Sequence, residues 1–538
     1  MKRWISIYLI VILLTITGLS GTISTHADSI YIIRIGLTQN LKQQSKVKIS
    51  TKKIAIGYCV NNRYSEYIHF TSKSGFTFAP ATGYYLVSDT VYPDYASVKA
   101  AYNKVRKLSS VKKYTYICMS GKNKWNLYVG GLSDVAKVSG WQTSVEDKVS
   151  GSFSVTSYNG HRVKITGGGN RLIYDGDETG QYAQIAGNVL NKKGSKTLKV
   201  NGYEYRGRIE IGPFGGGKLT VINITNVENY LRGVVGSEMS RSAPMEAMKA
   251  QAIVSRTFAQ NHCNNSGDTN MSTPYGINDA QNTGSNNTQK YGGYAKENKR
   301  AVEAVTSTRG RCIYSSGSQI NASFFPSSGG ATESALNIWG NNLSYLRMVS
   351  DVEELSLGAK PWKTSYSGAE LGKLVGLGTV EKVHVDATTG ANRVDSITFT
   401  DTTGKTVTLK HDNIRVRLGL NSTKFKLLTK EHPATEVFMS NSETITNTKS
   451  LKDCYAISGS GTVKSLNNGL EQYVAIGADN AANYMANDIV RDGVFTFAGL
   501  GKGHGAGMSQ AGATVMAMRG ADYVEIIKKY YGSSVSIR

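Results

Sequence analysis

The chain has 538 residues, in which 62 Lys and Arg outnumber 39 Asp and Glu and give a formal charge of +23. Hydrophobic residues make up 40%, enough for a sizeable core, and 58 Gly against 8 Pro exclude collagen-like and proline-rich disordered chains. At about 150 residues per domain, a chain of this length is expected to form roughly three to four domains.

The first 27 residues have the layout of a secretory signal peptide. Lys2 and Arg3 supply the positive start, Ile5–Ile16 is a nearly unbroken apolar run, and Thr25–Ala27 offers small residues for cleavage. The alternative is an uncleaved membrane anchor, but the apolar run is shorter than the about 20 residues that a full span needs. We therefore expect residues 1–27 to be removed and the protein to be secreted, to the cell wall or the outer face of the membrane.

The partner that the net positive charge indicates depends on whether the protein is exported. A basic cytoplasmic protein would suggest a nucleic acid partner, whereas an exported one meets polyanions such as anionic wall polymers or lipid head groups. We therefore expect anionic wall polymers, and no nucleic acid, among the partners. The alternative is a solvated basic surface without a specific partner. No segment after the leader is apolar enough to span a bilayer.

The cysteines give no sign of a metal site or a disulfide scaffold. They are far apart and form no C-x-x-C pair, at Cys59, Cys118, Cys263, Cys312 and Cys454. Their number is odd, at most two bridges could form, and the sequence does not give the pairing. The H-E-x-x-H pattern and clustered Cys/His spacings are absent too, so we expect no metal and no cofactor.

Residues 28–147 are predicted to form a small α+β module. A strand, a helix and two strands follow one another at Tyr84–Val87, Tyr95–Leu108, Tyr114–Met119 and Trp125–Val129. This order resembles the SPOR domains that bind peptidoglycan. The alternative is an unrelated α+β spacer.

The remaining residues, 148–538, mix strand-rich and helical stretches, so the predicted fold class of the whole chain is α+β. We expect strands over Lys148–Val221, helices over Asn223–Asn261, a polar loop over Asn264–Gly293, paired strands over Val380–Leu428, and two helices after Gly507. Residues 429–492 differ in composition and are predicted to be a β-rich insertion outside the substrate cleft.

Thr225–Met239 (TNVENYLRGVVGSEM) predicts an amphipathic helix. Thr225 and Glu228 have the spacing of a capping box, and the following apolar residues trace one helix face. Glu238 lies eleven residues after Val227, and at about 100° per residue eleven steps return to within about 20° of the starting direction. Glu238 is therefore expected on the buried stripe, at the C-terminal end of the helix.

Glu238 is the candidate catalytic residue, as a general acid. The helix dipole disfavours an anion at this end of the helix, and burial disfavours the charged form of a carboxyl group. Both effects favour the protonated state that a general acid needs. The alternative is a structural ion pair with Arg232, Arg241 or Arg256.

A second helix is predicted over Met245–His262, with Ser242 as its cap and Pro244 in its first turn. Arg256 lies within it. Because a basic residue facing Glu238 would favour the charged carboxylate, we assign Arg256 to substrate contact instead.

Val227–Ala259 (VENYLRGVVGSEMSRSAPMEAMKAQAIVSRTFA) resembles the core motif of the SpoIID/LytB family of bacterial cell-wall proteins. The hallmark of that family is a Glu-Met pair, here Glu238-Met239, followed by a helix with K-A-Q-A and R-T-[YF]-A. These two patterns are found at Lys249–Ala252 and Arg256–Ala259.

Three further blocks match the family in order, so that the resemblance covers Ile209–Arg538. They are the Asp…Gln-x-Tyr-x-Gly loop at Asn278–Tyr294, the serine-glycine block ASFFPSSGGATES and its sequel at Ala322–Leu346, and FAGLGKGHGAGMSQAGA at Phe497–Ala513, with Tyr523–Gly532 after it. Some sporulation members carry Cys and His in the first of these loops as a metal site. This chain has Asn278 and its neighbours there, so no metal is carried over. Lys502 and Ala511 stand where the family often has aromatic residues, which puts the packing of the pocket in doubt.

The resemblance implies a SpoIID-like catalytic domain over residues 148–538, with a helical core and β-rich parts, and a lytic transglycosylase activity. Such enzymes cut the glycan between N-acetylmuramic acid and N-acetylglucosamine without water. Glu238 would protonate the leaving oxygen, the C6 hydroxyl of the sugar would attack, and the same carboxylate would take its proton. One acid suffices for this 1,6-anhydro product, whereas ordinary glycosidases need two.

The substrate-binding candidates lie in the two glycine-containing blocks. Glycines let the backbone approach sugar hydroxyls closely, which makes Ser327, Ser328, Gly329 and Gly330 candidates; the alternative is a tight turn. In the closing block we expect His504, Ser509 and Gln510 to line the cleft, although a lone His is more often structural. Gly501, Gly503 and Ala506 also fit G-x-G-x-x-A, but no convincing βαβ unit precedes them and export removes the nucleotide supply.

A binding role is the competing function. Proteins of the LytB type are described as enhancers of a separate amidase, and the missing Cys pair makes this chain resemble them. Such a protein would hold peptidoglycan glycan strands through its basic surface and present a wall amidase. Binding driven by charge should weaken as salt rises. The sequence does not distinguish a sporulation role from a vegetative one.

Overall fold

The computed structural model describes residues 31–428 and 493–538, apart from 42, 122, 177–179, 188–196, 215–216, 271–272, 280–288 and 358–360, and four short strands between them. The predicted signal peptide lies outside the described residues. Helices and sheets are both extensive, which confirms the α+β class. In the described part of the chain, no helix has both the length and the apolar character that crossing a bilayer requires.

A seven-stranded sheet joins the start of the described chain to the strand that leads into the helical core. Its order is β17 (Ile277–Asn278), β1 (Ile32–Gly36), β16 (Thr220–Asn226), β15 (Arg208–Gly212), β12 (Gln184–Gly187), β3 (Lys53–Val60) and β4 (Arg63–Thr71). β1 and β16 are antiparallel, with Ile32 opposite Asn226. The last residue of β16 is therefore held by sheet pairing immediately before the first helix of the core begins.

A ten-stranded sheet contains the predicted strand–helix–strand–strand unit. Its order is β14 (Tyr203–Arg206), β13 (Thr197–Val200), β2 (Val47–Ile49), β5 (Phe76–Pro80), β10 (Arg162–Gly167), β11 (Asn170–Asp175), β7 (Thr115–Gly121), β8 (Lys124–Leu132), β6 (Tyr84–Ser88) and β9 (Phe153–Thr156). Four of these strands, with α3 (Tyr95–Val105), α4 (Val135–Ser139) and α5 (Gln142–Val149), run β6-α3-β7-β8-α4-α5-β9 along the chain. Their antiparallel pairing places β6 between β8 and β9, the arrangement of a split β-α-β fold.

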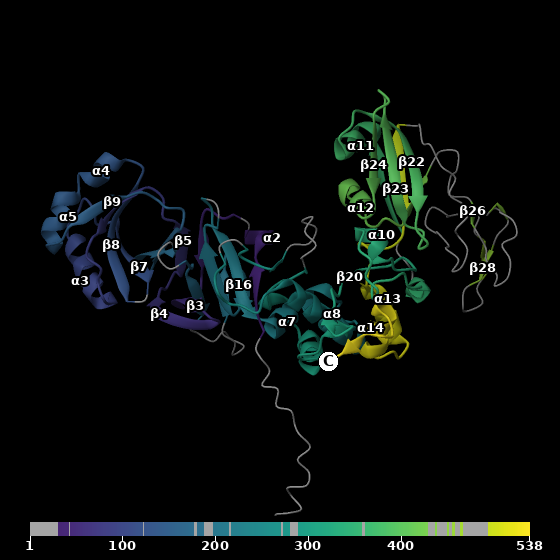
Figure 1. The fold of residues 1–538 in the computed structure, drawn as a ribbon, viewed down its shortest axis with the longest axis horizontal. Coiled ribbons are helices and arrows are strands. Elements are labelled where there is room, and N and C mark those ends of the chain that lie inside the picture. The colour runs from purple at the N-terminus through teal and green to yellow at the C-terminus, as the bar shows by residue number, and fades with distance from the viewer. Residues whose placement is uncertain are drawn as a thin grey trace, which may run out of the picture. The chain divides into compact units, whose positions relative to one another are not determined.

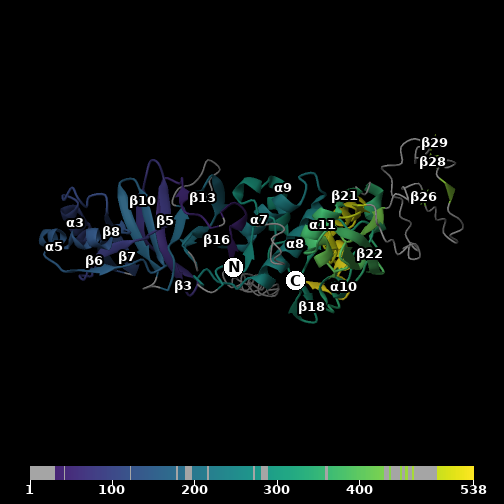
Figure 2. The same cartoon turned by 90° about the horizontal axis from the view of Figure 1, so that it is seen from above.

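The predicted boundary between residues 147 and 148 falls inside α5. Strands from both sides of that boundary share both large sheets, because β10 and β11 join β5 and β7, and β12 joins β3. α3 and α5 lie together on one side of the β6–β8 strands (Figures 1 and 2). The peptidoglycan-binding role of this module stays a prediction.

The helical core follows the sheets. Its main helices are α7 (Val227–Glu238), α8 (Met245–His262), α9 (Lys299–Ser307), α13 (Gln510–Met518) and α14 (Tyr523–Tyr531). α8 begins and ends at the predicted residues, and the last two helices confirm the predicted pair. α8 contacts α7, α13 and α14, which lie beside it in Figure 1. Buried side chains of α8, α13 and α14 form one apolar cluster that includes Ile253, Ala513 and Ile527.

Both helix caps differ from the predicted ones. Thr225 still belongs to β16, because pairing with β1 continues to Asn226. The cap of α7 is Asn226, whose Oδ1 accepts the backbone N–H of Asn229 at 2.8 Å. α8 begins directly after Pro244 without a side-chain cap, and Ser242 instead shares a hydrogen bond of 2.9 Å with the hydroxyl of Ser240.

Small elements connect the helices and position the glycine-containing blocks. They are α2 (Thr38–Leu41), η2 (Tyr294–Lys296), β18 (Ile313–Ser315), β19 (Ser318–Gln319), β20 (Phe324–Phe325), α10 (Ala335–Trp339), η3 (Val352–Leu357), β31 (Met508–Ser509) and β32 (Ser536–Ile537). β20 and β31 pair in parallel, with Phe325 opposite Ser509. This pairing brings the serine-glycine block next to the start of α13.

A further lobe surrounds its own apolar cluster. It contains the antiparallel sheet of β22 (Val380–Thr388), β23 (Val394–Asp401) and β24 (Thr406–Lys410), the sheet β21 (Trp362–Ser367), β30 (Val494–Gly499) and β25 (Phe425–Leu428), and the helices α11 (Gly368–Val375) and α12 (Asn413–Leu418). The paired strands predicted over Val380–Leu428 are confirmed.

The predicted insertion starts and finishes at neighbouring strands of this lobe. β25 ends at Leu428, and β30, which pairs with it, begins at Val494. Within residues 429–492 the structure describes only β26 (Glu436–Val437) with β27 (Lys449–Ser450) and β28 (Tyr455–Ile457) with β29 (Val463–Ser465). The rest of the insertion lies outside the described residues.

Candidate functional site

Glu238 is the last residue of α7 and faces a pocket of about 230 Å³. The side chain is half-buried, as its place on the apolar stripe predicts. The pocket is lined by residues of the α7–α8 connection, the serine-glycine block and α13: Glu238, Met239, Ser240, Ser242, Ala243, Pro326, Gln510, Ala511, Thr514 and Met518. Glu238 is the single acidic residue in this lining.

Two N–H groups hold the carboxylate of Glu238. The backbone N–H of Lys290 donates to Oε1 at 2.7 Å, and the side-chain amide of Gln510 donates to Oε2 at 3.3 Å. The same Gln510 amide donates to Oε1 of Gln251 at 3.2 Å. Donors of this kind fix the direction of a carboxylate and stabilise its charged form.

The loop predicted from Gln-x-Tyr-x-Gly supplies the first of these donors. The amide of Gln289 donates to the carbonyl of Ser255 at 3.2 Å, and the hydroxyl of Tyr291 donates to Asn223 at 2.9 Å. The backbone N–H of Gly292 donates to the hydroxyl of Ser237 at 3.2 Å. Bonds on both sides of Lys290 therefore set its N–H against Glu238.

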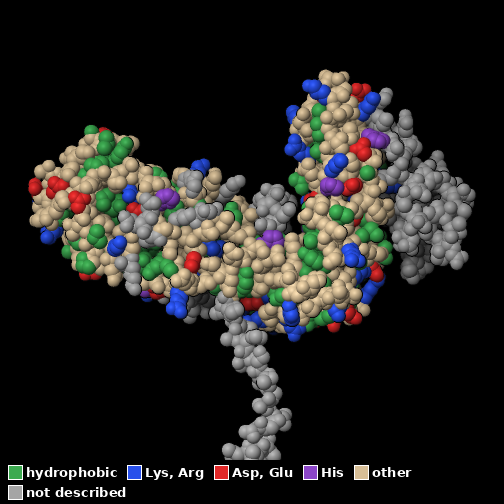
Figure 3. Space-filling model, viewed as in Figure 1, with side chains coloured by type: hydrophobic (Ala, Val, Ile, Leu, Met, Phe, Trp, Pro, Cys, Tyr) green, Lys and Arg blue, Asp and Glu red, His purple; other side chains and the backbone are tan. Residues whose placement is uncertain are grey.

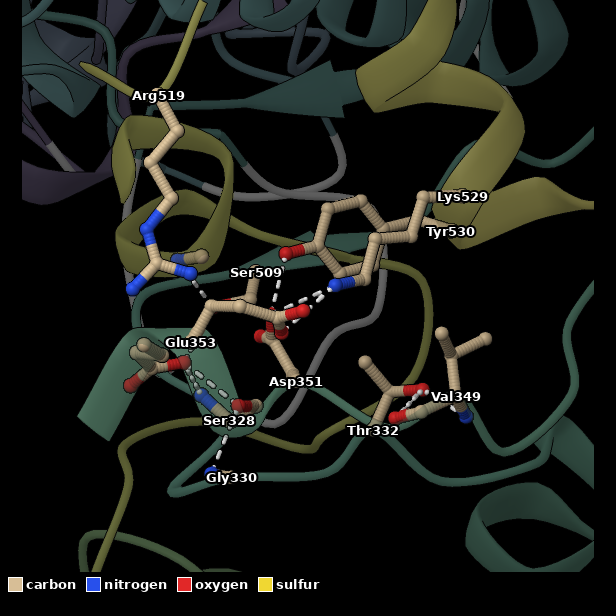
Figure 4. Close-up of polar contacts among 12 residues, drawn as sticks. Ser328, Gly330, Thr332, Val349, Asp351, Glu353, Ser509, Arg519, Lys529 and Tyr530 are labelled. Atoms are coloured by element: carbon tan, nitrogen blue, oxygen red, sulfur yellow. Dashed lines mark hydrogen bonds and ion pairs between the residues drawn. The ribbon is translucent and has the colours of Figure 1, made fainter. Parts of the chain in front are cut away.

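The serine-glycine block surrounds a different carboxylate, that of Glu354 in η3. It accepts the backbone N–H of Ser328 at 2.8 Å, the hydroxyl of Ser328 at 2.6 Å, and the hydroxyl of Ser327. The hydroxyl of Ser509, the cap of α13, donates to the same carboxylate at 2.8 Å. Figure 4 shows Ser328 and Ser509 in this cluster. Glu354 therefore ties the block to the first turn of α13, which carries Gln510.

The two acids of this cluster have opposite shifts. Burial raises the pKa of Glu354, but the hydrogen bonds from Ser327, Ser328 and Ser509 outweigh it and leave this pKa lowered. Burial, and then the charge of Glu354, raise the pKa of Asp351 to about 7. The hydroxyl of Tyr530 donates to Asp351 at 2.9 Å (Figure 4). Sequence reasoning missed both acids, and the only signal was an acidic DVEEL segment between two family blocks.

His504 is held by the backbone on both ring nitrogens. Nδ1 accepts the N–H of Ala506 at 3.1 Å, so Nε2 carries the proton that it donates to the carbonyl of Phe324 at 3.0 Å. Burial lowers the pKa of His504 to about 4. The ring also lies against Phe325 and Trp339. These contacts favour a structural role for this neutral imidazole.

Arg256 is fully buried, with 0% of its surface exposed. Its Nε and Nη2 donate to the carboxylate of Glu228 at 2.7 and 2.8 Å, and Nη1 donates to the carbonyl of Arg311 at 3.2 Å. Glu228, expected to complete the capping box, is therefore the partner of Arg256. The guanidinium joins α7 to α8 and favours a structural role over the predicted contact with substrate.

The predicted residues fall into three groups. Glu238 and Gln510 meet in the pocket. Ser327, Ser328, Gly329, Gly330 and Ser509 lie behind it around Glu354, with Ser328, Gly329, Gly330 and Ser509 buried. Arg256 and His504 are internal supports.

The cysteines that the structure describes, Cys59, Cys118, Cys263 and Cys312, are buried and form no disulfide with one another; Cys454 lies outside the described residues. Among the side chains that the structure describes, no three His, Cys, Asp or Glu form a group that could hold a metal ion.

The site thus has an acid at the end of a core helix, held by a downstream loop and by the first residue of α13. The family model for SpoIID, described as "Stage II sporulation protein", matches residues 215–314. This match covers α7, α8 and the Lys290 loop. This region of the chain therefore matches the SpoIID family.

Several curated relatives share a larger part of the chain. An uncharacterized protein of Brachyspira hyodysenteriae is 29% identical over 362 residues, 67% of this chain and 79% of that protein. "Stage II sporulation protein D" of Bacillus subtilis is 29% identical over 355 residues, 64% of this chain and 82% of that protein. "Amidase enhancer" of Bacillus subtilis is 27% identical over 310 residues, 56% of this chain but 39% of that protein.

Proposed function

We propose that this SpoIID-family protein acts at the bacterial cell wall as a peptidoglycan lytic transglycosylase, with Glu238 as its catalytic acid and base. The observation that carries the proposal is the single carboxylate at the wall of a pocket, held by the N–H groups of Lys290 and Gln510. The family and the relatives named for sporulation and amidase enhancement support the role at the wall.

One carboxylate can complete the reaction because the substrate supplies the nucleophile. Protonated Glu238 donates its proton to the glycosidic oxygen as the bond from C1 of N-acetylmuramic acid to that oxygen breaks. The C6 hydroxyl of the same sugar then bonds to C1, and the carboxylate of Glu238 takes the hydroxyl proton. The products are a 1,6-anhydro end and a free N-acetylglucosamine end, and no water is consumed. Intramolecular attack gains from proximity.

The N–H donors have a defined task in this scheme. Once the proton has left, the bonds from Lys290 and Gln510 stabilise the carboxylate and keep it aimed at the reacting atoms. Gln510 is the residue of the predicted binding set that we propose to contact the glycan. Ser327, Ser328, Gly329, Gly330 and Ser509 shape the wall behind it, and Arg256 and His504 support the fold.

The decisive experiment compares glycan products. Purified glycan strands are incubated with the protein, and mass spectrometry measures anhydro-muramyl ends. Glu238→Gln keeps the shape of the side chain but removes the proton, so formation of these ends should fall by about 100-fold or more. Glu303→Gln, on the exposed side of α9, is the matched control and should act like the wild type. Unchanged cleavage by Glu238→Gln would rule out this acid.

A second candidate function is a non-catalytic enhancer of a wall amidase. The similarity to the protein named "Amidase enhancer" favours it. In that case neither the wild type nor Glu238→Gln would cut glycan strands alone, and both would stimulate an added amidase equally.

The proposal also includes export directed by residues 1–27. The proposed partners are peptidoglycan glycan strands and anionic wall polymers, and residues 28–147 are proposed to bind the wall. Expression with and without the first 27 residues, followed by fractionation of medium, wall and cytoplasm, tests the export. An equal distribution of both forms would contradict it.

A further inference from the structure

One segment of the chain has a strongly one-sided charge. Tyr95–Ser133 contains eight Lys and Arg and no Asp or Glu. It spans α3, β7 and β8. The neighbouring strands β10 and β11 add Lys164 and Arg171, whose side chains are half-buried.

Arg171 lies at the centre of this region, against Tyr116 of β7. Its guanidinium is 4.5 Å from the centre of the Tyr116 ring, and Nη2 donates to the Tyr116 hydroxyl at 2.6 Å and to the carbonyl of Lys113. Nζ of Lys164 lies 6.0 Å from the centre of the same ring. Two cations therefore share one tyrosine.

The pattern continues into α3 and the turn after it. Lys99 and Arg106 lie over the ring of Tyr102, at 4.3 and 5.1 Å from its centre. Lys113 lies 5.2 Å from the centre of the Tyr114 ring. We call this region the basic tyrosine face, and its members are Lys46, Lys99, Arg106, Lys113, Lys164 and Arg171 with Tyr102, Tyr114 and Tyr116.

These cations repel one another. Burial, and then the charge of Arg106, lower the pKa of Lys99; burial, and then the charges of Arg171 and Lys46, lower that of Lys164. Among the described residues, none of the six cations forms an ion pair with an Asp or a Glu. The fold therefore holds positive charge together at a cost in stability, which binding of an anion would offset.

We propose that the basic tyrosine face binds a linear polymer with repeated phosphate groups. Lys and Arg are suited to phosphate oxygens, and the buried rings of Tyr102 and Tyr116 help to hold in place the cations that lie over them. The choice of this kind of polymer rests on the proposed function at the cell wall.

A membrane surface fits this face less well. Interfacial binding combines basic residues with apolar side chains that enter the bilayer. The large hydrophobic side chains that the structure exposes are elsewhere, and none belongs to the basic tyrosine face. The face offers positive charge instead, above the buried rings of Tyr102 and Tyr116. Charge without exposed apolar side chains suits a hydrated polyanion.

The test measures binding of the full chain to poly(glycerol phosphate) by titration calorimetry at low and high salt. Wild-type affinity should fall as salt rises, since bound cations on the polymer are released. Lys99→Gln/Lys164→Gln should weaken binding on the order of tenfold. It should not lower the melting temperature, because the folded state disfavours both of these charges.

The matched control removes the same charge elsewhere. Lys405→Gln/Lys410→Gln changes two exposed lysines at β24 and should bind as the wild type does. An equal loss in both double variants would show an effect of net charge and overturn the proposal. Phosphatidylglycerol vesicles and poly(dT) are compared with poly(glycerol phosphate) at equal phosphate concentration. Tighter binding to the vesicles or to poly(dT) would overturn the proposal in favour of a membrane or a nucleic acid.

The result is separable from the proposed catalysis. Lys99→Gln/Lys164→Gln should still form anhydro ends on purified glycan strands, and Glu238→Gln should still bind the polymer. If the lysine variant instead binds the polymer normally but no longer cleaves glycan strands, the inference is contradicted. The role of Glu238 is unaffected by that result.

Discussion

At the scale of single residues, Gln510 is one of the two donors that hold the carboxyl of Glu238, with the backbone N–H of Lys290. Its amide donates to Glu238 and to Gln251, so it links α7, α8 and α13 at one point. Gln510→Met has a similar size but loses both hydrogen bonds. We expect kcat for anhydro-end formation to fall roughly tenfold or more, in line with removal of a donor that stabilises charge. Gln319→Met, which changes a glutamine outside the pocket lining, is the control; an equal loss there would exclude a local role for Gln510.

Some of the site could be predicted residue by residue, and some could not. Helix periodicity predicts the place of Glu238 on the buried face of α7, and the resemblance of its block to the family predicts Gln510 beside the same pocket; the structure brings the two together. Glu354 was not predicted, because an acid in a DVEEL segment is ordinarily a surface residue. Its partners Ser328 and Ser509 are 26 and 155 residues away in the chain, and no local pattern gives such contacts.

At the scale of elements, α7 packs closely against the segment that contains Tyr291 and η2. A Cβ added at Gly236 would lie 2.1 Å from the carbonyl oxygen of Lys296 in η2. Gly233, one turn earlier, approaches Tyr291 in the same way, with a Cβ at 2.7 Å. These glycines allow the helix to reach the segment that contains Lys290.

Gly236→Ala therefore has two opposing effects. Alanine favours a helix by about 1 kcal/mol over glycine, whereas forcing a methyl group into a packed site costs about 1–3 kcal/mol. Because the added methyl group would clash with a backbone carbonyl, we expect the cost of the clash to exceed the gain in helix propensity. The melting temperature should therefore fall, and Lys290 should move away from Glu238. Differential scanning calorimetry and the glycan assay measure both effects. A more stable variant with full activity would contradict this close packing.

The start of α7 shows why element boundaries are harder to predict than element types. The local signal of Thr225 and Glu228 is a valid capping box, yet pairing with β1 keeps Thr225 in β16 and moves the cap to Asn226. Arg256 then takes Glu228 as its partner. By contrast, Met245–His262 was predicted with its observed bounds, because Pro244 and helical periodicity are local signals.

At the scale of the whole molecule, charge is distributed unevenly. Figure 3 shows Lys and Arg side chains scattered over the visible face, interspersed with fewer Asp and Glu. The basic tyrosine face is different, because burial, and then the charges of neighbouring cations, lower the pKa of Lys99 and of Lys164 there. The net charge of +23 therefore predicts general attraction to polyanions, but only the fold identifies where a specific site could form.

The buried acids around α13 and α14 should make the stability of the folded unit depend on pH. Asp351 has a pKa of about 7 when folded, against about 3.9 in an unfolded chain. Between these values the folded state binds more protons than the unfolded state, so this group lowers stability as pH rises from about 4 to about 7. Lys529, with Nζ 3.9 Å from Asp351, compensates only in part.

Asp351→Asn removes this titration but keeps an oxygen that can accept the hydroxyl of Tyr530. The variant should match the wild type near pH 3, where Asp351 is protonated in both the folded and the unfolded state, and exceed its free energy of unfolding by on the order of 2–4 kcal/mol at pH 8. Urea titrations across this pH range measure the difference. Tyr530→Phe should move the wild-type transition to higher pH, since the hydrogen bond that it removes lowers the pKa of Asp351. A difference between Asp351→Asn and the wild type that stays constant from pH 5 to pH 8 would show that the carboxyl group does not titrate in this range.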